Sequence, residues 1–309
     1  MSTEGLSRDE LVREIQRLKE ERGAIILAHV YQKPEVQDIA DYVGDSLGLS
    51  QEAAKTGARV VVFCGVHFMA ETAAMLSPEK IVLLPAANAG CPMADMAAAE
   101  EVRRKKEETG AVVVAYVNTS AAVKAESDYC CTSANAARVL AAIPSGKPIL
   151  FVPDRHLGEF AARRAEREVI LWNGFCPTHH RLTAEDVLAA RDEHPGAPVL
   201  VHPECRSEVV ELADYVGSTS GIINFVQRSQ AREFIIGTES GILHPLRKEN
   251  PEKAFYLASD KLVCPNMKRT TLELVKRSLE TLTPRITVPE EIRRRAQAAL
   301  GRMLEIGRG

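Results

Sequence analysis

Three of the seven cysteines are followed directly by proline, and these thiols are the clearest candidates for chemistry in the sequence. They are Cys91 in "NAGCPMAD", Cys176 in "GFCPTHH" and Cys264 in "KLVCPNM", at spacings of 176 − 91 = 85 and 264 − 176 = 88 residues. Thiolates are soft ligands that suit iron–sulfur clusters. Three of them on a four-iron cubane leave one iron without a protein ligand, and a Lewis-acid catalyst needs such an open position.

The other cysteines follow a different pattern. The sequence contains no CxxC pair, which argues against a zinc ribbon, a thioredoxin-type site and a ferredoxin-type ligand run. An odd number of cysteines without a secretory signal also argues against a disulfide framework. We therefore expect small buried side chains at the four remaining positions, which are Cys64, Cys130, Cys131 and Cys205.

A second set of polar residues recurs at nearly the same period. His29, Tyr116 and His202 end apolar, strand-like runs and are 116 − 29 = 87 and 202 − 116 = 86 residues apart. Two positions further on stand Tyr31, Asn118 and Glu204, and a third set consists of Ser46, Ser133 and Thr219. Landmarks that recur in one order, three times, indicate three copies of one structural unit.

The elements that position these residues alternate between strand-like and helical patterns. Continuous apolar runs such as "RVVVFCG" and "PILFVP" alternate with helical segments such as "TAEDVLAARDEHPG", a pattern typical of parallel sheets flanked by helices. We predict an α/β fold of three pseudo-symmetric domains, at 24–97, 98–181 and 182–268, around a pseudo-threefold axis. The terminal segments, 1–23 and 269–309, are predicted to pack on the first domain. The first contains a helix with a capping box at Ser7 and Glu10.

The recurring polar residues are predicted to face one cavity. Ligands of parallel sheets bind beyond the carboxyl ends of the strands, and residues i and i+2 of a strand point the same way. Hydroxyl and N–H groups at helix starts suit phosphate or carboxylate. The predicted substrate therefore carries several anionic groups. His179, three residues after Cys176, is a candidate substrate contact or support for the metal site.

Composition excludes several classes of protein. The chain of 309 residues is 45% apolar and 26% charged, with a net charge of −3, which gives no reason to expect binding to nucleic acid or an anionic membrane. Its longest apolar runs are too short to span a bilayer, and its N-terminus lacks the apolar core of a signal peptide. We expect a cytoplasmic protein.

The motifs together resemble those of the quinolinate synthase family over about residues 24 to 270. They are "AHVYQ", "GDSLGLS", "FCGVHFMAETA", "AGCPMADM", "YVNTSAAVKAESD", "CTSANA", "WNGFCPTH", "VHPEC" and "GTESG". The resemblance implies three analogous α/β domains and a [4Fe-4S] cluster held by Cys91, Cys176 and Cys264. It also implies a transferase that condenses iminoaspartate with dihydroxyacetone phosphate, releasing phosphate and water, to give quinolinate for NAD biosynthesis.

The resemblance also suggests roles for single residues. His29 and His202 would bind carboxylate or hydroxyl groups of the substrate, with Tyr31, Glu204 and His29 as the catalytic candidates. Tyr116 and Asn118 would orient the substrate, and its phosphate and carboxylate oxygens would be held by Ser46, Ser133, Ser218 and Thr219. Contact with the oxidase that produces iminoaspartate is a further open expectation. Two alternatives also stay open: a diphthamide-type cluster enzyme that cleaves S-adenosylmethionine, and a cluster-based sensor.

Overall fold

The computed structural model describes residues 6–307 and contains three four-stranded sheets, all of them parallel. The strand orders are β2-β1-β3-β4, β6-β5-β7-β8 and β10-β9-β11-β12. Each sheet thus places its own first strand second in the order and is built in the same way as the other two. This confirms the predicted α/β class with three sheet-and-helix units. The arrangement of the units around an axis stays a prediction.

The chain divides into two compact units, which we describe separately. Unit 1 contains the first sheet and runs to Cys91, together with Pro265–Arg293; unit 2 contains Pro92–Cys264, with the other two sheets, and the chain from Arg294 on. The elements of unit 1 are α1 (Arg8–Arg22), β1 (Ala24–His29), α2 (Pro34–Asp38), β2 (Tyr42–Gly44), α3 (Ser46–Lys55), β3 (Val60–Cys64), α4 (His67–Leu76), β4 (Ile81–Leu83) and α14 (Leu272–Thr281).

Unit 2 repeats the pattern twice. Its first half contains η1 (Ala94–Met96), α5 (Ala99–Thr109), β5 (Val112–Tyr116), α6 (Ala121–Ala125), β6 (Tyr129–Cys131), α7 (Ala136–Ala142), β7 (Ile149–Val152), α8 (Arg155–Ala165), β8 (Ile170–Leu171) and α9 (Pro177–His180). Its second half contains α10 (Ala184–Glu193), β9 (Val199–Val201), α11 (Ser207–Leu212), β10 (Tyr215–Val216), α12 (Thr219–Arg228), β11 (Glu233–Gly237), η2 (Ser240–Ile242), α13 (Leu243–Glu249) and β12 (Ala254–Leu257). The last helix, α15, spans Glu290–Ile306.

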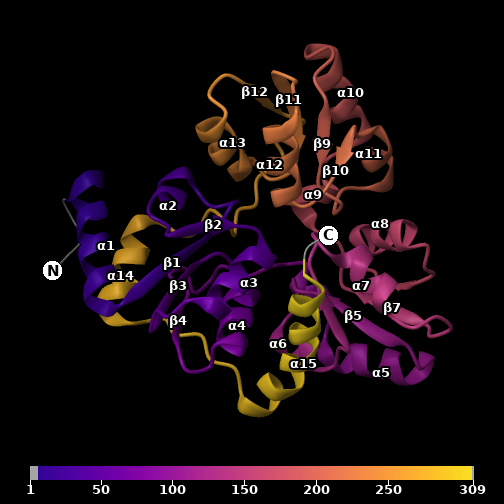
Figure 1. Cartoon of the computed structure of the whole chain (residues 1–309), viewed down its shortest axis with the longest axis horizontal. Helices are drawn as coiled ribbons and strands as arrows, with labels where there is room; N and C mark the ends of the chain where they lie inside the picture. The colour runs from indigo at the N-terminus through magenta and orange to yellow at the C-terminus, as the bar shows by residue number, and fades with distance from the viewer. Residues whose placement is uncertain (1–5, 308–309) are drawn as a thin grey trace. The chain divides into compact units, whose positions relative to one another are not determined.

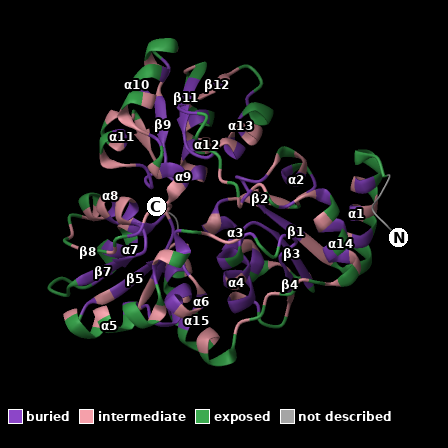
Figure 2. Ribbon diagram, turned by 180° about the vertical axis from the view of Figure 1, so that it is seen from behind, coloured by how far each residue is buried: buried purple, intermediate pink, exposed green. Residues whose placement is uncertain are grey.

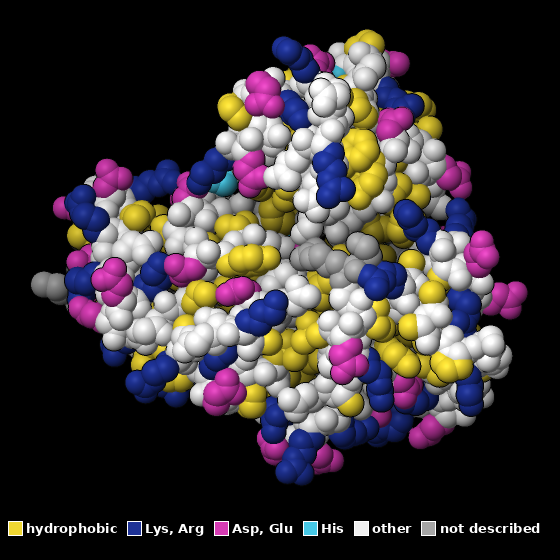
Figure 3. Space-filling model, viewed as in Figure 1, with side chains coloured by type: hydrophobic (Ala, Val, Ile, Leu, Met, Phe, Trp, Pro, Cys, Tyr) yellow, Lys and Arg dark blue, Asp and Glu magenta, His cyan; other side chains and the backbone are white. Residues whose placement is uncertain are grey.

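The central strands form the core of each sheet. All residues of β3, β7 and β9 are buried, and Figure 2 shows these strands in purple, whereas the outward faces of α5 and α10 are green. Burial on both faces explains why the strands read as continuous apolar runs rather than as alternating patterns. On the face displayed in Figure 3, side chains of both charge signs are interspersed on each unit.

A repeated aspartate ties each sheet together. Its carboxylate accepts a hydrogen bond from the backbone N–H of the residue fifteen positions earlier, in the unit's first strand. The pairs are Asp41 with Ile26, Asp128 with Val113 and Asp214 with Val199, each at 2.8 Å. A cation from the helix that precedes the unit's first strand contacts the same carboxylate. These cations are Lys19 at 2.5 Å, Lys106 at 2.8 Å and Arg191 at 2.9 Å. The recurring Asp-Tyr dipeptides of the sequence therefore have a structural function.

Helices α1 and α14 pack together on the first sheet, as Figure 1 shows. Leu11, Ile15 and Leu18 of α1 share one apolar cluster with Val275 and Leu279 of α14 and with buried residues of β1 and β3. The capping box predicted at the start of α1 is present, because the Ser7 side chain accepts a hydrogen bond from the N3 backbone N–H while the N3 carboxylate accepts from Ser7 N–H. This burial joins the two ends of unit 1.

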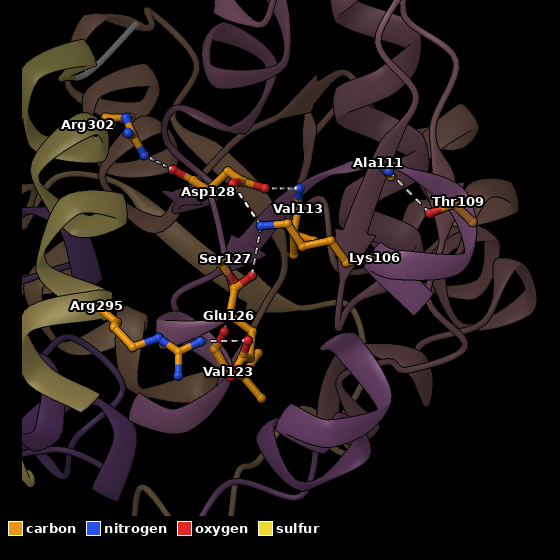
Figure 4. A network of polar contacts seen from close by, with 10 residues as sticks. All are labelled: Lys106, Thr109, Ala111, Val113, Val123, Glu126, Ser127, Asp128, Arg295 and Arg302. Atoms are coloured by element: carbon orange, nitrogen blue, oxygen red, sulfur yellow. Dashed lines mark hydrogen bonds and ion pairs between the residues drawn. The ribbon is translucent and has the colours of Figure 1, made fainter. Parts of the chain in front are cut away.

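Helix α15 contacts the second sheet unit, where the sequence prediction placed it on the first. Arg295 Nη2 lies 2.8 Å from the buried carboxylate of Glu126, Arg302 donates to the backbone oxygen of Asp128, and Asn135 Nδ2 donates to Met303 O at 3.2 Å. Figure 4 shows the arginine contacts, and Figure 1 shows α15, in yellow, beside α6. The helix also buries Ala296, Ala299, Leu300 and Met303. Because α15 has no counterpart in the repeat, the sequence pattern did not reveal these partners. Residues 1–5 and 308–309 of the predicted terminal segments lie outside the described residues.

Candidate functional site

The site residues of the third sheet follow β9 in a turn that fixes a histidine. His202 Nδ1 accepts the backbone N–H of Glu204 at 3.3 Å, and its Nε2 lies 3.1 Å from Ser133 Oγ. In unit 1, His29 Nδ1 accepts the N–H of Tyr31 at 3.1 Å in the same way. Both histidines are almost fully buried. The predicted equivalence of these two turns is therefore visible at the level of hydrogen bonds.

Glu204 is a buried carboxylate that lies next to two histidines and a tyrosine. Its Oε2 lies 2.7 Å from His179 Nδ1 and 3.6 Å from His202 Nδ1, and Tyr116 also donates to it. Burial alone would raise the pKa of Glu204, but His202, His179 and the hydrogen bonds from His179 and Tyr116 lower it to about 2. Glu204 is therefore ionised at neutral pH and can accept a proton or bind a cationic or donor group.

His179 links this carboxylate to a thiol. Its Nδ1 lies 3.2 Å from Cys176 Sγ, and its Nε2 lies 2.8 Å from Thr238 Oγ1. The rings of His179 and His202 stack with centroids 4.8 Å apart. One ligand atom from each of Cys176, His179 and Glu204 lies within 4.8 Å of the others. A thiol, an imidazole and a carboxylate gathered in this way form a group that can hold a metal ion.

The seven cysteines fall into two groups by exposure. Cys91, Cys176 and Cys264 are partly exposed, whereas the other four are buried. Burial raises the pKa of the thiol to about 12 in Cys64 and in Cys130, and it also raises the pKa of Cys131 and of Cys205. A buried thiol with a raised pKa is a poor nucleophile and ligand. Among the cysteines, the donor chemistry of a soft metal centre therefore fits the three that precede proline.

Two buried carboxylates near the cysteines were not singled out from the sequence. Asp154 Oδ2 accepts the backbone N–H of Cys176 at 3.1 Å, and Glu239 Oε1 accepts that of Cys264 at 3.0 Å. Burial and the nearby charge of Glu204 raise the pKa of Asp154. Their position directly after the second strand-like run of each unit, in "VPDRH" and "GTESG", was the available signal.

The predicted site residues are divided between the two units. Unit 1 contains His29, Tyr31, Ser46 and Cys91, and unit 2 contains Tyr116, Asn118, Ser133, Cys176, His179, His202, Glu204, Ser218, Thr219 and Cys264. Within unit 2 the structure gathers Tyr116, Ser133, Cys176, His179 and His202 around or next to Glu204.

The polar residues at helix starts occupy different positions. Ser218 is the N-cap of α12 and accepts the N–H of Gly221 at 3.2 Å. Ser133 and Ser218 line a cavity of about 300 Å³ between the second and third sheet units. Ser46 and Thr219 are the first residues of α3 and α12. Asn118 Oδ1 is buried and accepts no hydrogen bond from the described residues, as expected of an acceptor whose donor belongs to a ligand.

Comparison with known proteins assigns the family. Residues 13–305 match the model of the quinolinate synthetase A protein family. The chain belongs to the quinolinate synthase family. It is 60% identical to the quinolinate synthase of Desulforudis audaxviator over 299 residues, which cover 96% of this chain and 99% of that protein. It is 59% identical to that of Methanoregula boonei, with 96% and 98% covered, and 55% identical to that of Geobacter metallireducens, with 97% and 99% covered.

Family membership confirms the resemblance found in the sequence motifs. The match covers nearly the whole length of these quinolinate synthases and of this chain. It is therefore not limited to one sheet unit. Within residues 6–307, no helix combines the length and the apolar composition needed to cross a membrane.

Proposed function

We propose that this chain is a quinolinate synthase, which condenses iminoaspartate with dihydroxyacetone phosphate and releases phosphate and water. The observation that carries the proposal is the buried, ionised Glu204 beside Cys176 and His179, in a chain of the quinolinate synthase family. The reaction joins two small anionic substrates without net oxidation, so it needs proton transfer and charge stabilisation. We place the activity in NAD biosynthesis and in the cytoplasm.

A [4Fe-4S] cluster is the proposed cofactor, with Cys91, Cys176 and Cys264 as its ligands. The partial exposure of these three thiols and the burial of the other four support this choice. When bound by three cysteines, such a cluster supplies an iron with an open position, which acts as a Lewis acid. In unit 2, the partly exposed Cys176 thiol offers a soft ligand. The buried Asn118 Oδ1 of the same unit accepts no hydrogen bond from the described residues.

The chain's own residues are proposed to bind the substrates and move protons. Glu204 is the proposed proton-transfer group, and the Tyr116 hydroxyl that donates to it fixes its orientation. His202, whose ring is oriented by its own turn, presents Nε2 together with Ser133 Oγ to a carboxylate or hydroxyl group. In unit 1, His29 and Tyr31 take the corresponding roles, with Tyr31 as a second proton-transfer group.

Anion binding is assigned to the hydroxyl-bearing residues. Ser46, Ser133, Ser218 and Thr219 are proposed to hold phosphate and carboxylate oxygens, because hydroxyls and backbone N–H groups at helix starts bind such oxygens. Asn118 is proposed to accept a hydrogen bond from a substrate donor, since its Oδ1 is buried and accepts none from the described residues. A transient contact with the oxidase that supplies iminoaspartate would shorten the lifetime of that unstable substrate in solution.

The test is anaerobic quinolinate formation by reconstituted protein, measured together with the visible absorbance of the cluster. We expect product from the wild type and none from Cys176→Ser, whereas Cys64→Ala, the matched control from the buried group, should form product at a rate close to wild type. Absence of product from wild-type protein with an intact cluster would contradict the proposal. Cleavage of S-adenosylmethionine by that protein would instead support the diphthamide-type reaction.

A further inference from the structure

Two of the three Cys-Pro loops are anchored by a buried carboxylate that spans two backbone segments. Asp154 Oδ2 accepts the N–H of Cys176 at 3.1 Å, while its Oδ1 accepts that of Leu157 at 2.8 Å. Glu239 Oε1 accepts the N–H of Cys264 at 3.0 Å, while its Oε2 accepts that of Gly241 at 2.7 Å. Both side chains have 0% exposure. Each carboxylate therefore joins a cysteine to the turn after β7 or β11.

The surrounding backbone shows that these positions are equivalent. The residue after each carboxylate donates its N–H to the carbonyl two residues before the cysteine, with Arg155 bonding Gly174 at 2.9 Å and Ser240 bonding Leu262 at 2.8 Å. Unit 1 has the same backbone clamp, from His67 to Ala89 at 2.8 Å. Its residue at the carboxylate position is Val66, which is buried. The three sheet units thus share one loop structure, and the second and third of them add a carboxylate to it.

Helix capping does not explain both carboxylates. At the start of α8, Asp154 Oδ1 accepts the N–H of Leu157, whereas its Oδ2 accepts the N–H of Cys176. Glu239 precedes η2, a 3₁₀-helix of three residues, and glutamate is not among the preferred N-cap residues. Burying a carboxylate is unfavourable unless its oxygens are hydrogen-bonded. A serine would cap either turn at lower cost, so the second contact, to the cysteine N–H, accounts for the choice.

We propose that Asp154 and Glu239 are positioning residues, which hold the backbone of Cys176 and Cys264 so that their thiols are preorganised to bind the metal cluster. This inference rests on the proposed function, in which these cysteines are cluster ligands. A thiol whose backbone is fixed loses less conformational freedom when it binds metal, and residues that orient ligands typically change metal affinity by about 10- to 100-fold. The Cys91 loop, with Val66 at the equivalent position, is the internal comparison.

The test uses Asp154→Asn and Glu239→Gln in the full-length chain. Each amide keeps the size of the side chain but replaces one accepting oxygen with a donor, which then faces a backbone N–H. Thr183→Ala is the control, because it removes the side-chain cap of α10, in which Thr183 Oγ1 accepts the N–H of Asp186. Melting temperature, measured on cluster-free protein, shows how much stability each variant loses.

The first readout is the rate at which reconstituted protein loses iron to a chelator under anaerobic conditions. We expect roughly 10- to 100-fold faster loss from Asp154→Asn and Glu239→Gln, with Thr183→Ala close to wild type at a comparable loss of melting temperature. Iron loss within about twofold of wild type in both carboxylate variants would overturn the proposal. A wild-type chain that takes up no cluster would contradict the proposed function instead.

The second readout tests, in protein without a cluster, whether the carboxylates hold the cysteine loops in place. Alkylation rates of single cysteines in cluster-free protein are followed by mass spectrometry. We expect Asp154→Asn to accelerate alkylation at Cys176 about tenfold and Glu239→Gln to do so at Cys264, with Cys91 unchanged in both. Equal acceleration at all three cysteines would indicate general loosening, and no acceleration would indicate that the carboxylates do not hold the loops. Either result would overturn the inference.

Discussion

Replacing Glu204 by glutamine should cost both activity and stability, and the structure gives the size of each loss. The pKa of Glu204 falls from 4.5 to about 2 in the folded protein, and a lowering of this size corresponds to about 3 kcal/mol of stability. Breaking a buried charge pair by removing one partner costs a similar amount, about 3–5 kcal/mol. Because glutamine cannot accept the proton, turnover should fall about 10²- to 10⁴-fold.

The pH dependence of the stability loss provides a second check. A carboxylate whose folded pKa lies below its unfolded value contributes stability that is fully present above the unfolded pKa of 4.5 and is lost as the pH falls toward 2. The difference in unfolding free energy between wild type and Glu204→Gln should therefore be constant from pH 7 to about pH 5 and should shrink below pH 4.5.

Urea unfolding of cluster-free protein, followed by circular dichroism, measures these differences without a contribution from bound metal. Glu211→Gln is the matched control, because this glutamate of the same sheet unit has 67% side-chain exposure and should change stability by less than about 0.5 kcal/mol. A loss below about 1 kcal/mol at pH 7, or a loss that does not shrink below pH 4.5, would refute the assignment of Glu204 as an ionised, stabilised carboxylate.

Three further outcomes are expected. Cys64→Ala should keep the wild-type iron content after reconstitution, because this thiol is fully buried and its pKa is raised to about 12; loss of iron would contradict the division of the cysteines. Glu126→Gln should lower the unfolding free energy by about 1–2 kcal/mol, because Glu126 loses its charge pairs with Arg103 and Arg295. Loss of the Arg295 pair should also speed proteolysis at α15; an unchanged cleavage rate would exclude this contact as an anchor. Leu279→Ala should cost about 2–5 kcal/mol in urea unfolding, since the side chain is fully buried between α14 and the first sheet, whereas Leu188→Ala, at 48% exposure, should be nearly neutral.

The repeat was predictable from sequence because one structural rule recurs in each unit. Residues such as Asp128, which binds the N–H of Val113 at 2.8 Å, must stand at a fixed distance from the strand they hold. The same holds for His202, whose Nδ1 accepts a hydrogen bond from the backbone N–H of the residue two positions later, Glu204. Constraints over short sequence distances leave a spacing that can be read directly, and three copies make that spacing visible.

The parts that were missed depend on contacts over longer distances. Arg295 reaches Glu126 across 169 residues of sequence, and no local pattern distinguishes that docking from docking on the first sheet. Thr238 contacts His179 across 59 residues of sequence. It directly follows β11, and no local pattern marks it as a contact of His179. Asp154 reads as a simple helix cap, because its second contact, to Cys176, is only visible in three dimensions. Such pairings become clear only when the sheets are assembled.

The central claim is that the three cysteines before proline hold a cluster that faces the substrate site. Its most direct test is the Mössbauer spectrum of ⁵⁷Fe-reconstituted, anaerobic protein, recorded alone, with quinolinate and with S-adenosylmethionine. We expect a [4Fe-4S] spectrum in which quinolinate shifts the signal of a single iron and S-adenosylmethionine shifts none. A cluster spectrum that quinolinate leaves unchanged, or a wild-type protein that incorporates no cluster, would contradict the claim.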